Sequence, residues 1–370
     1  MKKGKRILRA LAAVCLVVFM AMMTARLVSA PAKTAQTPAP RKDTVGVITL
    51  WHVVGFKPYR GSVSTLISDA AKKIERANYG VYFDVIAMTV EDYGKRIARG
   101  EQPDMISFPA GLLDGEELLA LEPDSYPVEE RLLATGTRDN ILYALPFALS
   151  PVIVAANNDL ARKAGLELPE GMITPETFAA AVSKAEPTGK AAVLAGDPLL
   201  LALLGGRGET VGLDAFKEGK AACAAGPMRL GAELSALSEK GKGFAFTIHG
   251  VTGSFCMAQY IALGRDINKA KTPYALLLAS ALMGNKTQAK LAALGLAPVI
   301  EMEADWSPDP ALPVDPVAAC KSAFLPNAFL LNRYEDALGE LAARVLAGEE
   351  GAARELEQRR KELVKGMQIK

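Results

Sequence analysis

The amino-acid sequence predicts an α/β fold built on a parallel sheet. The chain has 370 residues, 50% of them hydrophobic, which is enough for a large core and favours two domains over one. In the first third of the chain, short apolar runs typical of buried strands alternate with segments of helical periodicity. Because parallel strands are joined by crossover helices, this alternation predicts right-handed βαβ units.

The first third carries this alternation three times. Residues 62–78 place apolar side chains on one helical face, and Gly100 follows a short second helix as a C-cap type of residue. We expect strands at residues 45–51, 81–88 and 103–108, and helices at residues 62–78, 91–99 and 112–120.

After Tyr143 the chain becomes richer in helices. The expected elements are an apolar run at 152–156, helices at 160–164, 175–184, 199–204, 213–224 and 229–240, a strand at 244–248, a helical region at 272–294 broken near 284–285, and a mostly helical end at 334–366. Residues 304–314 are rich in proline, which predicts a linker.

The N-terminus has the pattern of an export signal. A basic stretch, residues 2–9, precedes the apolar run 11–23, which is too short for the roughly 20 residues of a spanning helix. Residues 30–32 (APA) offer a cleavage site, and residues 28–30 offer a second. We therefore expect a signal peptide at 1–32, with an uncleaved anchor as the alternative, and a polar tether at 33–43.

Composition excludes several classes of function. Without its first 32 residues the chain carries 37 basic and 41 acidic side chains, so it lacks the excess of positive charge typical of nucleic-acid-binding proteins. Two histidines and four cysteines exclude metal-rich and disulfide-stapled proteins. The sequence has no P-loop, no G-x-S-x-G and no H-E-x-x-H pattern. We expect no enzymatic activity, no cofactor and no metal.

The order of short segments resembles a known family, the extracellular solute-binding proteins of ABC importers, in the cluster that includes the maltose-type binding proteins. No single motif is specific, but their order extends over residues 44–366. The segments are residues 47–52 (VITLWH), 100–106 (GEQPDMI), 143–147 (YALPF), 156–160 (ANNDL), 246–250 (FTIHG) and 325–327 (LPN).

The resemblance implies a two-lobe periplasmic-binding-protein-like fold, with a ligand cleft between lobes that are joined by crossover segments. It places lobe 1 at 44–147 plus 262–303, and lobe 2 at 150–258 plus 315–370. It implies an exported monomer, in the periplasm or on the outer face of the membrane. The partners would be a small solute and the membrane permease subunits that receive it.

The chain also departs from the family pattern. Pro175 and Ala156 stand where relatives carry an aromatic residue, and the segment between Gly250 and Ala270 is short. Carbohydrate sites favour flat aromatic platforms, yet the chain has only two tryptophans. These departures indicate a divergent member, for a sugar-like or another small polar solute.

Nine residues are candidates for contact with the solute. His52 and His249, the only histidines, stand at the ends of predicted strands in different lobes, which raises the hypothesis of a paired contact across the cleft. The simpler interpretation is that each caps its strand end with a local hydrogen bond. The full set is Trp51, His52, Phe108, Phe147, Ser150, His249, Thr252, Trp306 and Tyr334.

The sequence thus predicts an extracytoplasmic solute-binding component of an ABC importer that closes over its solute. The alternative is a membrane-tethered or degenerate receptor of the same fold, used for sensing. The identity of the solute, the partner permease and the cleavage of the signal stay open. Three cysteines remain after export, and the sequence leaves open whether Cys256 and Cys320 form a disulfide.

Overall fold

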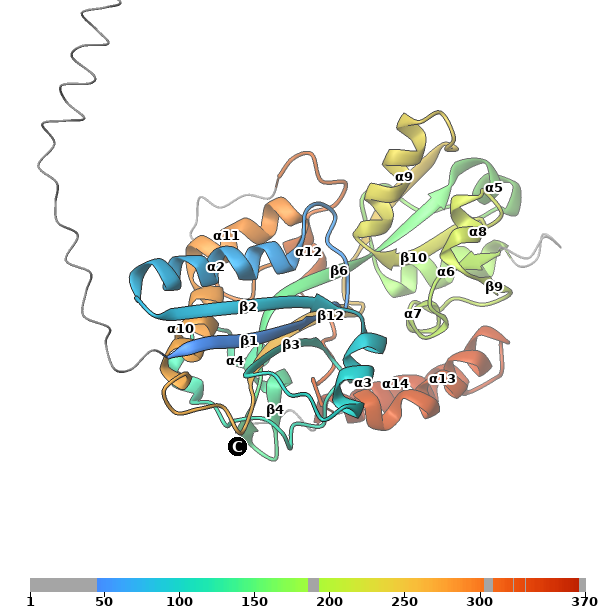
Figure 1. Cartoon of the computed structure of the whole chain (residues 1–370). Coiled ribbons are helices and arrows are strands. Elements are labelled where there is room, and N and C mark those ends of the chain that lie inside the picture. Colours follow the sequence, from blue (N-terminus) through green and yellow to red (C-terminus); the bar gives the residue numbers. More distant parts are fainter. Residues whose placement is uncertain (1–44, 186–192, 303–308, 322, 330, 366–370) are drawn as a thin grey trace, which may run out of the picture. The chain divides into compact units, whose positions relative to one another are not determined.

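The computed structural model describes residues 45–185, 193–302, 309–321, 323–329 and 331–365 (Figure 1). The expected signal segment and tether lie outside the described residues. None of the described helices combines the length and the apolarity that a membrane crossing requires.

The first lobe begins with the predicted βαβ units. Strand β1 (Gly46–Val53) pairs in parallel with both β2 (Val81–Met88) and β3 (Met105–Pro109). Helix α2 (Val63–Ala77) follows β1, and α3 (Val90–Ala98) follows β2. The hydroxyls of Ser62 and Thr89 accept backbone N–H bonds at the starts of these helices, as good N-caps do.

One long strand belongs to both lobes. The first part of β6 (Leu145–Asn157) pairs antiparallel with β12 (Cys256–Leu263), which in turn pairs antiparallel with β3. The second part of β6, from Val152, pairs with the strands of the second lobe, β10 (Cys223–Pro227) and β11 (Phe246–Val251). The β2–β1–β3 part of the first lobe's sheet is parallel, as the alternation predicts, and β12 and β6 extend it with antiparallel pairs.

Short strands and helices complete both lobes. The second lobe contains α5 (Asn158–Ala164), β7 (Met172–Ile173), α6 (Pro175–Ala185), β8 (Leu194–Ala195), α7 (Pro198–Leu203), β9 (Thr210–Val211), α8 (Leu213–Lys217) and α9 (Arg229–Glu239). The other elements are α4 (Glu130–Leu133), β4 (Thr137–Arg138), β5 (Ile141–Leu142), α10 (Thr272–Met283), α11 (Asn285–Leu294), α12 (Pro316–Cys320), α13 (Leu331–Leu346) and α14 (Ala352–Lys365).

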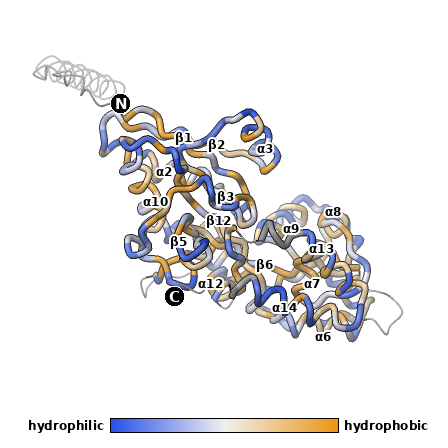
Figure 2. Tube along the Cα trace, turned by 90° about the horizontal axis from the view of Figure 1, so that it is seen from below, coloured by the Kyte–Doolittle hydropathy of each residue, from blue (hydrophilic) through white to orange (hydrophobic). Residues whose placement is uncertain are grey.

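The hydrophobic core is divided in the same way. One cluster gathers buried residues from 48–149, 256–300 and 320–329. In the second lobe, Val152 and Val154 of β6 belong to one cluster, while Ile153 and Ala155 belong to another, because alternate side chains point to opposite faces of the sheet. Figure 2 shows hydrophobic residues along β6 and hydrophilic ones along the outer helix α14. The exact lobe boundaries stay a prediction.

Two of the expected helices are wrong. Residues 112–120 form irregular chain that follows β3. Residues 213–224 form the short α8 and then enter β10 at Cys223. Alanine favours helices, but here the run Ala221–Ala225 is buried, and from Cys223 onward it lies in β10 between β8 and β6, where small side chains fit between neighbouring layers. Cys223, Cys256 and Cys320 are buried free thiols, so Cys256 and Cys320 form no disulfide, and Sγ of Cys256 donates to the Ser150 carbonyl oxygen at 3.4 Å.

Candidate functional site

A polar cluster lies buried near the carboxyl ends of β1 and β3. The hydroxyl of Ser107 lies 3.0 Å from Nδ1 of His52 and accepts a 3.0 Å hydrogen bond from Nε2 of Gln259. The same Nε2 donates to the carbonyl of Val53 at 2.9 Å, and the Gly55 N–H donates to Oε1 of Gln259 at 3.3 Å. The cluster therefore joins β1, β3 and β12, and its polar groups bond to one another or to the backbone.

Burial also fixes the charge of His52. The side chain is 2% exposed, and desolvation lowers its pKa from 6.5 to about 4. The imidazole is therefore neutral at pH 7, and its Nδ1 can accept the proton of the Ser107 hydroxyl. These groups hold the strands together and present no charge to solvent.

A groove of about 360 Å³ lies between the two lobes, beside the loop that follows β1. Its first wall is the loop after β1, and its second wall is formed by α8, the end of β10 and the first turns of α9. The lining residues are Val54, Gly55, Phe56, Lys57, Leu213, Lys217, Pro227, Arg229, Leu230 and Glu233. Ligands of open α/β sheets bind outside the carboxyl ends of strands, which is where β1 and β10 end.

Glycine is required where the first wall packs on the sheet. A Cβ on Gly55 would lie 2.5 Å from Cβ of Pro109, at the end of β3. A larger residue would push the loop at 54–57 away from the sheet and reshape the groove.

The second wall carries a charged network. The Glu233 carboxylate lies 2.8 Å from Nζ of Lys217 and 3.4 Å from Nε of Arg229. Partial burial alone would raise the pKa of Glu233, but the hydrogen bond and charge of Lys217, followed by those of Arg229, lower it overall. The Lys217 pKa is raised, chiefly by its hydrogen bond to Glu233. The Lys217–Glu233 pair is therefore charged at pH 7.

The two lobes also meet beside the groove. Nη1 of Arg229 lies 3.5 Å from the carbonyl oxygen of Tyr59, in the loop that follows β1. A Cβ added to Gly231 would lie 3.5 Å from the Tyr59 ring, an ordinary van der Waals distance, so this ring lies against α9. Contacts from both lobes therefore surround the groove.

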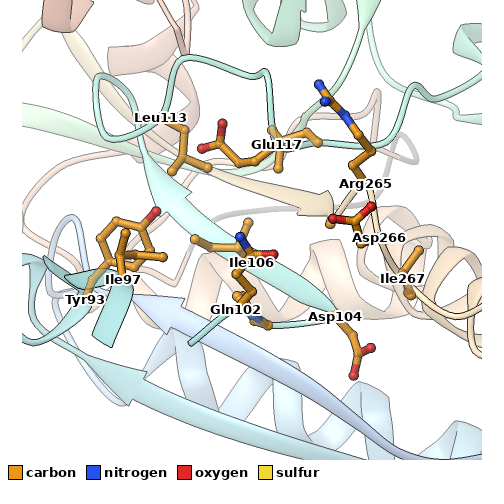
Figure 3. A pocket seen from close by; sticks show the side chains of 13 residues that line it. Tyr93, Ile97, Gln102, Asp104, Ile106, Leu113, Glu117, Arg265, Asp266 and Ile267 are labelled. Carbon is orange, nitrogen blue, oxygen red and sulfur yellow. The ribbon is translucent and has the colours of Figure 1, made fainter. Parts of the chain in front are cut away.

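A second pocket, of about 260 Å³, lies within the first lobe (Figure 3). Ile106 of β3 and Leu113 line the pocket, Tyr93 lies beside Ile97 at one end, and Asp266 lies beside Arg265 at the other end (Figure 3). Burial, followed by the charges of Glu117 and Asp114, raises the Tyr93 pKa to about 12. Burial and a hydrogen bond shared with Asp114 also raise the Glu117 pKa. The lining holds three carboxyl groups, Asp104, Glu117 and Asp266, and one cation, Arg265, so the pocket is acidic, and the elements lining it all come from one lobe.

The three aromatic candidates near β1, β3 and β6 are buried. Phe108 and Phe147 are 0% exposed, and Phe108 packs against the rings of Tyr260 and Phe329. Trp51 is 3% exposed and lies beneath the guanidinium of Arg96, which is 5.2 Å from the ring centroid. In this structure these rings pack within the core, and their contact with a solute stays a prediction.

The polar candidates are separated from one another. Ser150 is buried in β6 and His249 in β11; within the described part of the chain, Oγ of Ser150 and Nδ1 of His249 have no hydrogen-bond partner. Burial lowers the His249 pKa, and a bond to the Pro169 backbone opposes this only in part. Thr252 donates to the carbonyl of Ile173 at 3.3 Å. His52 and His249 belong to different local networks. Their roles in binding likewise stay predictions.

Two candidates lie outside the described residues, Trp306 and the side chain of Tyr334. Among the residues that are described, no group of three or more His, Cys, Asp and Glu could hold a metal ion.

The charged groups of the groove were missed by the sequence interpretation. Lys217 and Arg229 are brought together by the turn from α8 into β10, a segment that the sequence had predicted to be one helix. The available signal was Gly219 and the Gly226–Pro227 pair, which punctuate the alanine-rich run and favour a short strand over a long helix.

Comparison with known proteins identifies the fold. No family model and no curated protein matches the sequence. A cyclic α-maltosyl-1,6-maltose binding protein from Arthrobacter globiformis superposes with a TM-score of 0.62 at 15% identity, over 87% of this chain and 98% of that one. An ABC substrate-binding protein from Listeria monocytogenes, solved with cycloalternan, gives 0.57 at 16% identity, over 88% and 100%.

The chain has the two-lobe fold of ABC substrate-binding proteins. The maltose–maltodextrin binding protein of Alicyclobacillus acidocaldarius agrees, with a TM-score of 0.55 at 13% identity, over 87% of this chain and 99% of that chain. The substrate-binding-protein fold thus extends over nearly all of the described residues, and the groove lies between its lobes.

Proposed function

We propose that this chain is the extracytoplasmic solute-binding component of an ABC importer, with its solute held in the groove between the lobes. One observation carries the proposal: the loop after β1 and the start of α9 line a single groove, in a fold whose solved neighbours are named as binding proteins for cyclic α-maltosyl-1,6-maltose and for maltose and maltodextrin. Residues 1–32 would direct export, and a membrane permease would receive the solute.

Binding between two lobes suits this task. A solute that touches both walls stabilises the arrangement in which the lobes approach, because it gains contacts there that a single lobe does not offer. The permease would then distinguish loaded from empty protein by the arrangement of the lobes. The continuous strand β6 gives the lobes a shared backbone about which small rotations can occur.

A thermal-shift screen of the purified full-length protein tests the proposal. The panel holds neutral sugars, polyols, amino acids, polyamines, carboxylates, phosphate esters and divalent metals. A solute at 100 times its dissociation constant should add about 2.7 kcal/mol to the free energy of unfolding, which raises Tm by a few degrees. A rise with one solute class supports the proposal. No rise with any class contradicts it and favours a degenerate receptor, and N-terminal sequencing of the exported protein would then reveal whether the signal is retained as an anchor.

A further inference from the structure

The groove lining carries more positive than negative charge. Lys57, Lys217 and Arg229 contribute three cations, whereas Glu233 is its one carboxylate. Lys57 is exposed, on the wall opposite Glu233, and forms no ion pair with any residue that the structure describes. Resting on the proposed function, we propose that the solute carries an anionic oxygen group, a carboxylate or a phosphate ester, on a small polar body.

The arrangement of the charges supports an anion. Glu233 is shared by two cations on its own wall, so it neutralises only one of their two positive charges. Asp214 also pairs with Lys217, at 3.1 Å, but its side chain is 91% exposed and lies outside the lining. The groove therefore presents cations on both walls, with Lys57 as the excess charge, and apolar neighbours such as Leu213 and Leu230 strengthen its field.

The same lining is poorly suited to a neutral oligosaccharide. Its aromatic residue is Phe56, which is 7% exposed and offers little ring surface. Neutral sugars are usually held by broad stacking on tryptophan or tyrosine, whereas Lys and Arg recognise carboxylate and phosphate oxygens through charge-assisted hydrogen bonds. The volume of about 360 Å³ is close to the lower end for ligand pockets and matches a solute of monosaccharide size.

Isothermal titration calorimetry on the full-length protein separates the solute classes. The probes are glucuronate, glucose 6-phosphate, glucose and maltose, so that one arm tests a carboxylate, one a phosphate ester and two the neutral sugars. We expect heat of binding with at least one anion and none with glucose or maltose. Raising the ionic strength should weaken anion binding, because the groove is open to solvent.

Charge variants test whether the anion binds at this groove. Lys57→Gln should weaken anion affinity about tenfold, the usual scale for one charge-assisted hydrogen bond, and Lys57→Arg should retain most of it. Lys240→Gln is the matched control: it makes the same change at an exposed site just past the end of α9, about 16 Å along the helix axis from Arg229. Its affinity should equal that of the unchanged protein.

The outcomes separate this inference from the proposed function. A neutral sugar that binds with an affinity unaffected by Lys57→Gln would overturn the anion inference while leaving the binding function standing. Anion binding lost equally in Lys57→Gln and Lys240→Gln would overturn it as well, because the effect would be one of overall charge. Failure of every probe and every class in the thermal-shift panel would reject both.

Discussion

Two polar regions lie close together in this molecule, and they differ in what their side chains are free to do. In the cluster of His52, Ser107 and Gln259, the polar groups are buried and bond to one another or to the backbone. In the groove between the lobes, Lys217, Arg229 and Glu233 are partly exposed and charged. The first region holds strands together, and the second can exchange its contacts with water for contacts with a solute.

The difference shows why strand ends alone do not locate a binding site. His52 lies near the carboxyl end of β1, as a solute contact would, but its side chain is 2% exposed and its Nδ1 is bonded to Ser107. The exposed charged side chains belong instead to the loop after β1 and to α9. If this account is right, changes in the cluster should alter stability and changes in the groove should alter binding.

The largest effect is expected from Gln259→Leu. The leucine leaves the Val53 carbonyl and the Gly55 N–H without the amide that now bonds to them, and it removes the donor to Ser107. Urea unfolding should show a loss of about 3 kcal/mol in the free energy of unfolding. Gln102→Leu, at an exposed position, is the control and should change stability little. Equal losses in the two variants would contradict the claim that the hydrogen bonds of this cluster stabilise the fold.

A smaller effect is expected from pH. The pKa of folded His52 is about 4, below the ordinary value of 6.5, so the unfolded chain binds the proton more readily between these values. The contribution of this group to stability is complete above pH 6.5 and is lost as pH falls toward 4. Lowering the pH from about 8 to about 5 should reduce the free energy of unfolding of the original protein by about 2 kcal/mol more than that of His52→Gln.

The comparison of the two unfolding curves provides the control for this prediction. Carboxylates titrate in both proteins, so only the difference between their pH dependences reports on His52. Parallel curves for the original protein and His52→Gln would show that the imidazole is not kept neutral by burial.

The smallest effect on stability is expected in the groove. Glu233→Gln removes a partly exposed carboxylate that two cations share, and such pairs contribute little to folding, so Tm should change by no more than a degree or two. Anion affinity should rise about threefold, because Lys217 and Arg229 lose their internal competitor. Calorimetry beside Glu239→Gln, at the exposed end of the same helix, checks this. A large drop in Tm would place Glu233 with the structural cluster instead.

Local sequence patterns predicted some regions well and others badly. β2 was predicted at its observed bounds, and β1 and α2 nearly so, because their periodicity and caps are local signals. β12 was not predicted, although it joins β3 to β6, because an apolar run does not indicate which strands it will pair with. The bonds of Gln259 to Val53 and Gly55 span 206 and 204 residues, and no local pattern carries such contacts.

The groove was beyond local prediction for the same reason. Its two walls come from residues 54–57 and 213–233, and each wall alone reads as an ordinary loop or helix with solvated charges. The excess of positive charge appears only when the fold brings Lys57 opposite Arg229 and Lys217. The order of family-like segments, in contrast, was enough to predict the two-lobe fold.

Hydrogen exchange with and without a solute identified by the screen tests the central claim most directly. If the solute binds between the lobes, amides at 54–57 and at 228–233 should become protected together. The acidic pocket of the first lobe supplies the contrast, at residues 102–106, 113–118 and 264–267, which should exchange at unchanged rates. Protection confined to those pocket segments, or to one wall of the groove alone, would contradict the account.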